Sequence, residues 1–237
     1  MCLKFTAKPI GKATMTRPMP TKERIIDIAG DIFGREGFKA ATIRRIAEAS
    51  GANIAAVNYH FRDKEGLYRA VLEDIFSKVF LKYPAVPLPG NDATPDERLY
   101  IFIHAMFLRF LGKEGWGGFS GRGKLIAREF LDPTPAFEDI VETYIRPQKN
   151  ILAKILSDLS REKISPEKTF SCAVSIMGQC IYYAFAGPIV RRLSENFIPG
   201  EENIDYLSDH VFRFSLGGIQ RIINDPGNNL SHEEKHL

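Results

Sequence analysis

The chain has 237 residues, 44% of them hydrophobic and 26% charged, a balance that excludes a disordered or fibrous protein. Its length is sufficient for one large domain or two small ones with a sizeable core. The net charge of +3 is unevenly distributed: residues 1–75 hold 13 Lys and Arg against 9 Asp and Glu (+4), and residues 76–237 hold the other 19 against 20 (−1). A small nucleic-acid-binding region followed by a neutral body would show this asymmetry.

The N-terminal residues 1–20 contain four basic residues, no acidic one and no apolar core of a signal peptide. We interpret this segment as a flexible basic leader; the alternatives are a later start at Met15 or Met19, or an arm that touches phosphate groups. The chain has three cysteines, Cys2, Cys172 and Cys180. They form neither a disulfide framework nor a Cys-x-x-Cys pair, which favours a reducing, cytoplasmic location.

Residues 21–82 show helical periodicity. Five apolar residues at helical spacing predict a helix that begins at Thr21 and ends within residues 34–38: Ile25, Ile28, Ala29, Ile32 and Phe33. A second short helix is capped by Thr42 and stops at Ser50-Gly51. Asn53 and Asp63 are the predicted N-caps of a third and a fourth helix, and the apolar stripe of the fourth consists of Leu67, Val71, Ile75 and Val79.

A Pro/Gly-rich stretch at 83–95 separates these helices from a second module, which begins at Thr94-Pro95. Further helices are predicted to start at Thr134-Pro135 and at Ser165-Pro166. A last long helix covers about 203–224, with one face formed by Leu207, Val211, Phe214, Gly218 and Ile222. No hairpin signal or β-branched run appears, so the predicted fold is all-α.

Residues 170–190 carry no charge and are long enough to span a bilayer. However, Ser171, Ser175 and Gln179 recur at every fourth position and form a polar stripe, and Gly187-Pro188 breaks the run. We therefore expect a helix that is buried between protein surfaces, with no membrane contact.

The third predicted helix combines small, polar and aromatic side chains. At about 100° per residue, Ile54, Val57 and Phe61 fall on one side, which is predicted to be buried. The opposite face and its flanks carry Ala52, Ala55, Ala56, Asn58, Tyr59 and His60. Together with the second helix and the joining sequence ASGAN, it forms a helix-turn-helix, whose second helix enters the DNA major groove.

The residue types on this face suit DNA. Alanines allow close approach to base edges and contact thymine methyl groups, and an asparagine pairs with adenine N6 and N7. Tyrosine and histidine reach base edges or phosphate oxygens. Thr42 and Lys64 lie at helix N-termini, where a phosphate is favoured, and Arg44 and Arg45 add positive charge.

Residues 21–68, with TIRRIAEASGANIAAVNYHFRDKEGLY at their centre, resemble the N-terminal domain of TetR-type transcriptional regulators. The shared features are the glycine turn after the first helix, the threonine that begins the second, the Tyr-His-Phe end of the third and the lysine that follows. The resemblance implies that the DNA-facing residues are Thr42, Arg44, Asn53, Ala55, Ala56, Asn58, Tyr59, His60 and Lys64. The alternative is that Tyr59 and His60 only brace the turn before the fourth helix.

Residues 128–147, REFLDPTPAFEDIVETYIRP, resemble the CecR-type subgroup. The resemblance implies a ligand-binding and dimerisation domain, in which helices at about 166–186 and 203–224 pair with their copies in a four-helix bundle. Gly217-Gly218 permits close helix approach. An apolar cavity is expected near residues 98–186. Its candidate lining residues, each of which is also a candidate core or surface residue, are His104, Phe107, Trp116, Arg128, Tyr144, Gln179 and Tyr183.

The predicted organisation is a leader (1–20), a helix-turn-helix domain (21–68, with a connecting helix to about 82), a ligand-binding and dimerisation domain (94–225) and a polar tail (226–237). Three strings imitate catalytic or metal-binding motifs: GFSGRGKL (118–125), HEEKH (232–236) and SPEK (165–168). The first has Leu125 where a phosphate loop needs Ser or Thr, the second lies in a polar tail without a third ligand, and the third is a helix cap. We therefore expect no enzyme, cofactor or metal site.

The function that these observations favour is a ligand-responsive transcriptional repressor. It is expected to bind a pseudo-palindromic operator as a homodimer and to be released by a small-molecule effector. Activation instead of repression is left open. The alternatives from other classes are a helical small-molecule-binding enzyme and a membrane-associated sensor.

Overall fold

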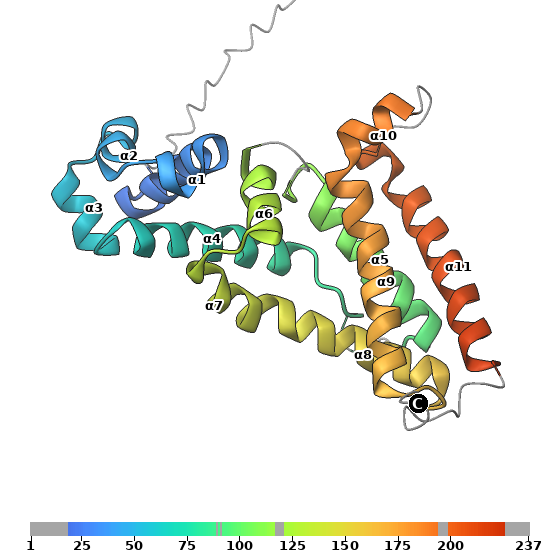
Figure 1. Cartoon of the computed structure of the whole chain (residues 1–237). Coiled ribbons are helices and arrows are strands. Elements are labelled where there is room, and N and C mark those ends of the chain that lie inside the picture. The colour runs from blue at the N-terminus through green and yellow to red at the C-terminus, as the bar shows by residue number, and fades with distance from the viewer. Residues whose placement is uncertain (1–18, 89, 91, 117–120, 194–198, 226–237) are drawn as a thin grey trace, which may run out of the picture.

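The computed structural model describes residues 19–88, 90, 92–116, 121–193 and 199–225 (Figure 1). Within these ranges the secondary structure is helical and contains no strand, so the predicted all-α fold is confirmed. The predicted leader, except Met19 and Pro20, lies outside the described residues. So do the tail at 226–237 with its HEEKH string and the first three residues of GFSGRGKL.

Three helices form one end of the molecule, which we call the head: α1 (Thr21–Ala40), α2 (Ile43–Ser50) and α3 (Ile54–Phe61). The helix α4 (Lys64–Lys82) then runs from the head into the body. The predicted caps are confirmed: Thr42 Oγ1, Asn53 Oδ1 and Asp63 Oδ1 accept from backbone N–H groups three residues on, at 3.3, 2.7 and 2.8 Å. Each cap is a local contact, which is why the sequence predicts it.

Two details of the head differ from the prediction. The first helix breaks at Gly37, where φ is 83°, and one more turn carries it to Ala40. Ile54, predicted to be buried, is 46% exposed, whereas Val57 and Phe61 are buried and Ala52 packs against the core. A helical wheel gives the angle of Ile54 around the helix axis but not its position along the axis. The residues that α3 contributes to the core are Val57 and Phe61, and Ile54 lies at the opposite, outer end of the helix.

The body contains the remaining helical segments. In chain order they are α5 (Pro95–Leu111), α6 (Gly121–Leu131), η1 (Pro135–Phe137), α7 (Glu138–Ile140), the π-helical turn η2 (Val141–Ile145), α8 (Arg146–Ser160), α9 (Pro166–Phe185), α10 (Gly187–Leu193), η3 (Glu201–Asn203) and α11 (Ile204–Ile223). Thr94 and Glu97 cap α5 reciprocally, and Ser165 caps α9. Thr134 does not cap η1 with its side chain; its hydroxyl instead bonds to Glu129.

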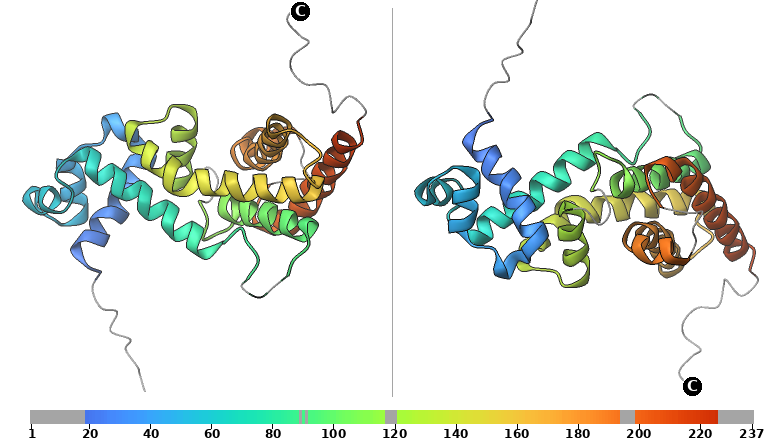
Figure 2. Two further views of the ribbon diagram at one scale, coloured as in Figure 1. Left: turned by 90° about the horizontal axis from the view of Figure 1, so that it is seen from below. Right: turned by 90° about the horizontal axis from the view of Figure 1, so that it is seen from above.

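Helix α5 is the centre of the body and contacts α8, α9 and α11. Helices α9 and α11 lie at the end of the molecule opposite the head, as both views of Figure 2 show. The predicted face of α11 is not uniformly buried within the chain: Leu207 and Val211 are buried, but Phe214 is 66% exposed and Gly218 is also exposed. Apolar residues occupy two sides of this helix, and one of them points away from the rest of the chain.

No single helix in the described ranges is long and apolar enough to cross a membrane. Helices α9 and α10 pass the same length and composition test only when taken together, and they are bent by 75° relative to each other. The predicted polar stripe lies along α9, where the hydroxyls of Ser171 and Ser175 donate to carbonyl oxygens four residues back at 3.0 and 2.9 Å. Gln179 Nε2 donates to Ser215 Oγ on α11 at 3.3 Å.

Candidate nucleic-acid interface and effector cavity

The outer face of α3 projects from the head into solvent. Ala55, Asn58, Tyr59 and His60 are exposed and Ala56 is half-buried. The Tyr59 side chain is 85% exposed, and its ring meets that of His60 at 5.2 Å between centroids and an interplanar angle of 72°. An exposed aromatic ring beside small and amide side chains is a surface that can read base edges in a groove.

The arginines of α2 flank this face. Arg44 Nε lies 3.0 Å from Glu48 Oε1, and an Arg45 amino group lies 3.1 Å from Glu36 Oε1. Both arginine side chains are mostly exposed. Exposed ion pairs of this kind contribute at most about 1 kcal/mol, so both guanidinium groups can turn to a phosphate at little cost.

Lys64, at the start of α4, has intramolecular partners. Its Nζ donates to the carbonyl oxygens of Lys39 and Ala41, at 3.4 and 3.2 Å, and lies 4.5 Å from the ring centroid of Phe38. It therefore holds the end of α1 against the start of α4, and a phosphate would have to share or replace these acceptors.

Thr42 and Asn53 use their side-chain oxygens as caps, which leaves the Asn53 amide N–H groups available as donors. Sequence reasoning did not select Arg62, which is exposed in the turn after α3 and has a φ of 70°. The sequence feature that could have identified Arg62 as a candidate DNA-binding residue is its position directly after the Tyr-His-Phe motif. All of the predicted DNA-facing residues thus lie on α2, α3, the adjoining turns and the first residue of α4, at one end of the molecule (Figure 1).

The seven candidate effector residues do not form one group. Trp116 and Tyr144 join an aromatic cluster, with centroids 4.9 Å from Phe76 and 5.4 Å from Phe80, respectively. Phe107 and Tyr183 face each other at 6.1 Å.

The other three candidates lie apart. His104 is half-buried at the contact between α5 and α11, where its Nε2 lies 3.1 Å from Asp205 Oδ1. Gln179 lies between α9 and α11, and Arg128 contacts the head.

A cavity of about 310 Å³ lies between α5, α8 and α9, within the size range of small-molecule sites. Its lining residues are Phe102, Ile145, Gln148, Lys149, Leu152, Phe170, Ala173, Val174, Met177, Gly178 and Ile181. None of the seven candidates is among these described lining residues. The sequence feature that could have predicted this cavity wall is the helical spacing of Ile145, Gln148, Lys149 and Leu152. This spacing places the polar residues Gln148 and Lys149 in an otherwise apolar stripe at the start of α8.

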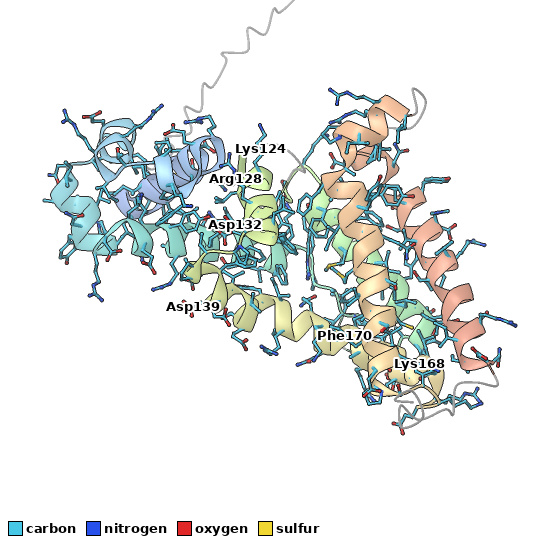
Figure 3. All side chains as sticks on the ribbon, in the orientation of Figure 1. Lys124, Arg128, Asp132, Asp139, Lys168 and Phe170 are labelled. Atoms are coloured by element: carbon cyan, nitrogen blue, oxygen red, sulfur yellow. The ribbon has the colours of Figure 1, made fainter. Side chains whose placement is uncertain are left out.

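Helix α6 connects the body to the head. The Arg128 guanidinium donates to the carbonyl oxygens of Phe33 and Gly34 on α1, at 3.1 and 3.2 Å, and Figure 3 labels it beside α1. A Cβ atom on Gly34 would lie 2.3 Å from the Gly121 carbonyl oxygen, so the two helix backbones approach closely because Gly34 has no side chain.

Glu129, the next residue of α6, is buried beside α4. Its carboxylate accepts hydrogen bonds from the Tyr68 hydroxyl and from Thr134, whose backbone N–H lies at 2.9 Å. Burial, reinforced by the bond to Glu129, raises the pKa of Tyr68 far above its ordinary value, so the hydroxyl remains a donor. Arg128 and Glu129 therefore attach α6 to both α1 and α4.

The described residues contain no group of three or more His, Cys, Asp or Glu that could hold a metal ion. The HEEKH string lies outside the described part of the chain.

Comparison with known proteins identifies both halves of the chain. Residues 25–71 match the family described as bacterial regulatory proteins, tetR family, and residues 95–219 match the C-terminal domain of the HTH-type transcriptional dual regulator CecR. CecR of Shigella flexneri is 30% identical over 146 residues, which are 57% of this chain and 63% of CecR. The repressor AcnR of Corynebacterium efficiens is 36% identical over 62 residues, which are 26% of this chain and 33% of AcnR. The chain thus spans less than two thirds of the length of these relatives.

The structure of AibR, solved in complex with isovaleryl coenzyme A and operator DNA, has the same fold, with a TM-score of 0.57 and 18% identity. The match covers 82% of this chain and 97% of AibR. Since the CecR-type match alone includes more than half of the chain, and the tetR-family match includes the head, the family follows from the sequence as well as from the fold. The chain belongs to the TetR family of bacterial transcriptional regulators and has a CecR-type C-terminal domain.

Proposed function

We propose that this protein is a ligand-responsive repressor that binds a pseudo-palindromic operator as a homodimer and is released by a small molecule. The observation that carries the proposal is the exposed face of α3, which carries Ala55 and Asn58 and from which Tyr59 projects almost fully into solvent. The proposed domains are residues 21–68 for DNA binding, with the connecting helix to about 82, and residues 94–225 for effector binding and dimerisation. The proposed location is the cytoplasm.

On DNA, the proposed base-reading residues are Asn58, Tyr59 and His60. Ala55 and Ala56 would allow close approach, while Arg44, Arg45 and Lys64 would contact phosphates. In a symmetric dimer the two α3 helices would contact successive major grooves, about 34 Å or a multiple of this apart.

The face of α9 and α11 that points away from the chain supports a dimer. Tyr182 of α9 and Phe214 of α11 are exposed there, and exposed apolar residues of this kind mark interaction surfaces. The groove between the two helices has a volume of about 360 Å³. A Cβ atom on Gly178, Gly217 or Gly218 would meet nothing within 4 Å, so there is room for a second copy to approach closely.

The relatives support the proposed output. AcnR is named as a repressor, CecR as a dual regulator, and the AibR complex contains both a coenzyme A thioester and operator DNA. The curated relatives are regulators, and we assign no catalytic activity to this chain. An effector releases the operator only if it binds the DNA-bound and free states with different affinities.

The test is selection of binding sites from random DNA duplexes with the full chain, repeated with candidate effectors, together with sedimentation analysis of the complex. We expect an inverted repeat bound by two chains and an effector that lowers the affinity. Recovery of no preferred sequence would refute the proposal. A reporter gene placed under the selected site distinguishes repression from activation.

A further inference from the structure

Arg109 of α5 is 1% exposed and is surrounded by neutral groups. Its Nε donates to the Tyr83 carbonyl oxygen and its Nη1 to Gln148 Oε1, both at 2.9 Å, and the guanidinium carbon lies 3.8 Å from the ring centroid of Phe80. These bonds use two of the five guanidinium N–H groups. Burial lowers the pKa of Arg109 to about 10, with no contribution from a neighbouring carboxylate in the part of the chain that the structure describes.

A buried cation is normally paired with an anion, because removing it from water is costly and neutral acceptors compensate only in part. With a pKa of about 10, Arg109 still carries its charge at neutral pH. An unmet donor lies nearby: the buried indole N–H of Trp116 has no acceptor among the described residues, and its ring centroid lies 6.1 Å from that of Phe80. The region thus combines a buried cation that has no acidic partner with one buried donor that has no acceptor among the described residues.

Gln148 links this cation to the cavity between α5, α8 and α9. Its amide oxygen accepts from Arg109, and its side chain is one of the two polar groups on the cavity wall, the other being the exposed Lys149. The remaining wall is apolar and includes Phe102, two turns before Arg109 on α5. Arg109 therefore lies directly behind the polar part of an otherwise apolar wall.

We propose that this cavity binds the effector, and that the effector is an amphipathic carboxylate. Its apolar body would lie between α8 and α9, and its carboxylate would join or displace Gln148 as the acceptor of Arg109. A carboxylate accepts two parallel hydrogen bonds from a guanidinium and carries the single charge that one buried cation balances. This inference rests on the proposed ligand-responsive function and specifies the chemical class of its ligand.

The same arginine offers a route to the DNA-binding end. Tyr83, whose carbonyl accepts from Arg109, directly follows the last residue of α4, and α4 leads to the head. A carboxylate that draws the Arg109 guanidinium toward Gln148 changes the hydrogen bond from Arg109 Nε to the Tyr83 carbonyl oxygen. The affinity for the ligand would thereby depend on the position of α4, and such a dependence is what release from DNA requires.

The experiment titrates the full-length protein with sodium octanoate and with octan-1-ol, a neutral compound of the same chain length. Benzoate and benzyl alcohol form a second pair of a different shape. Binding is followed by the fluorescence of Trp116, the only tryptophan of the chain, whose backbone N–H bonds to the Arg109 carbonyl oxygen at 2.6 Å, and by the melting temperature, which a ligand of the folded state raises. We expect at least one acid to bind about tenfold or more tightly than its alcohol.

Gln148→Glu is the main variant, because it places a carboxylate on Arg109 with almost no change in size. The new carboxylate should raise the melting temperature because it pairs with Arg109. It should weaken acid binding about tenfold or more because it occupies Arg109 and repels the carboxylate of the ligand. Arg109→Gln should make acid and alcohol bind equally, and Gln148→Glu keeps the test valid if Arg109→Gln does not fold. Lys149→Gln, on the same wall but exposed, is the matched control and should leave the preference for the acid intact.

The proposal is overturned if neither acid binds, if acid and alcohol bind equally to the unmodified protein, or if Gln148→Glu binds the acid normally. Operator affinity, measured with and without each compound, distinguishes failure of the carboxylate assignment from failure of the proposed ligand-responsive function. If a neutral compound releases the operator while the acids do not bind, the carboxylate assignment fails and the ligand-responsive repressor stands. If an acid binds as expected without changing operator affinity, the site stands and ligand-responsive repression fails.

Discussion

Asn58 is the residue on α3 whose side chain is best suited to distinguish one base pair from another, because its amide both donates and accepts. We predict that Asn58→Ala weakens operator binding by about 1–3 kcal/mol, with the loss confined to particular base pairs. Fluorescence anisotropy with single-base operator variants measures this effect. Asn150→Ala, an exposed asparagine of α8, is the control. A uniform loss across all operator variants would show that Asn58 does not read a base.

Lys64 combines a structural and a proposed electrostatic role. We predict that Lys64→Ala lowers the free energy of unfolding by about 1.5 kcal/mol, because its bonds to the Lys39 and Ala41 carbonyls are lost. It should also weaken binding to all DNA sequences and flatten the dependence of log affinity on log salt by about one. Denaturant unfolding and binding at several salt concentrations test the two effects separately. If the salt dependence of the DNA affinity were unchanged, Lys64 would have only the structural role of joining α1 to α4.

At the scale of elements, α6 is attached to α4 through the bond between Tyr68 and the buried Glu129. Removal of the hydroxyl in Tyr68→Phe leaves the carboxylate with fewer donors and should cost about 1–3 kcal/mol of stability. The structure predicts that operator affinity changes as well, because α6 is thereby loosened from the helix that leads to the head. Urea unfolding and operator titration measure both quantities.

The same pair predicts an effect of pH. Since burial and Glu129 raise the pKa of Tyr68 above its ordinary value of 10.0, the folded state holds this proton more tightly than the unfolded state. The resulting stability is fully present below about pH 10 and is lost as the pH rises further. The unfolding free energy of the unmodified protein should therefore fall more steeply above pH 10 than that of Tyr68→Phe. Parallel slopes would contradict this account of Tyr68.

For the whole molecule, the orientation of two heads depends on how two chains associate. Phe214 is 66% exposed on α11, so Phe214→Glu should leave the helical content of the chain unchanged and convert the proposed dimer to monomers, with loss of operator affinity. Sedimentation equilibrium and circular dichroism provide the measurements. Leu81→Glu on α4, at a position that is 86% exposed and remote from this face, should have no effect on association. If Phe214→Glu remained dimeric, the proposed interface would be wrong.

Interactions between residues close together in the chain are the ones that the sequence predicts correctly. The caps at Thr42, Asn53, Asp63 and Ser165 each join a side chain to a backbone N–H three residues on, and the local sequence contains both partners. The head also carries a motif specific enough to identify its family. Reasoning from periodicity alone was weaker: Ile54 lies at the correct angle but outside the core, and Phe214 shares a predicted face with residues that are buried.

The all-α fold, the capped helix starts and the family could therefore be read from short-range chemistry and motif, whereas the start of α6 at Gly121 was not predicted. The contacts that would transmit a signal required the folded chain, because their partners are far apart in sequence: Arg128 with Phe33, Tyr68 with Glu129, and Arg109 with Tyr83 and Gln148. Helical spacing shows that Arg109 lies on a buried face of α5, but it cannot show which groups surround the guanidinium. The packing of α4, α5 and α8 determines that the neighbours of the Arg109 guanidinium are neutral. An anionic effector is proposed because these neighbours leave the positive charge unpaired.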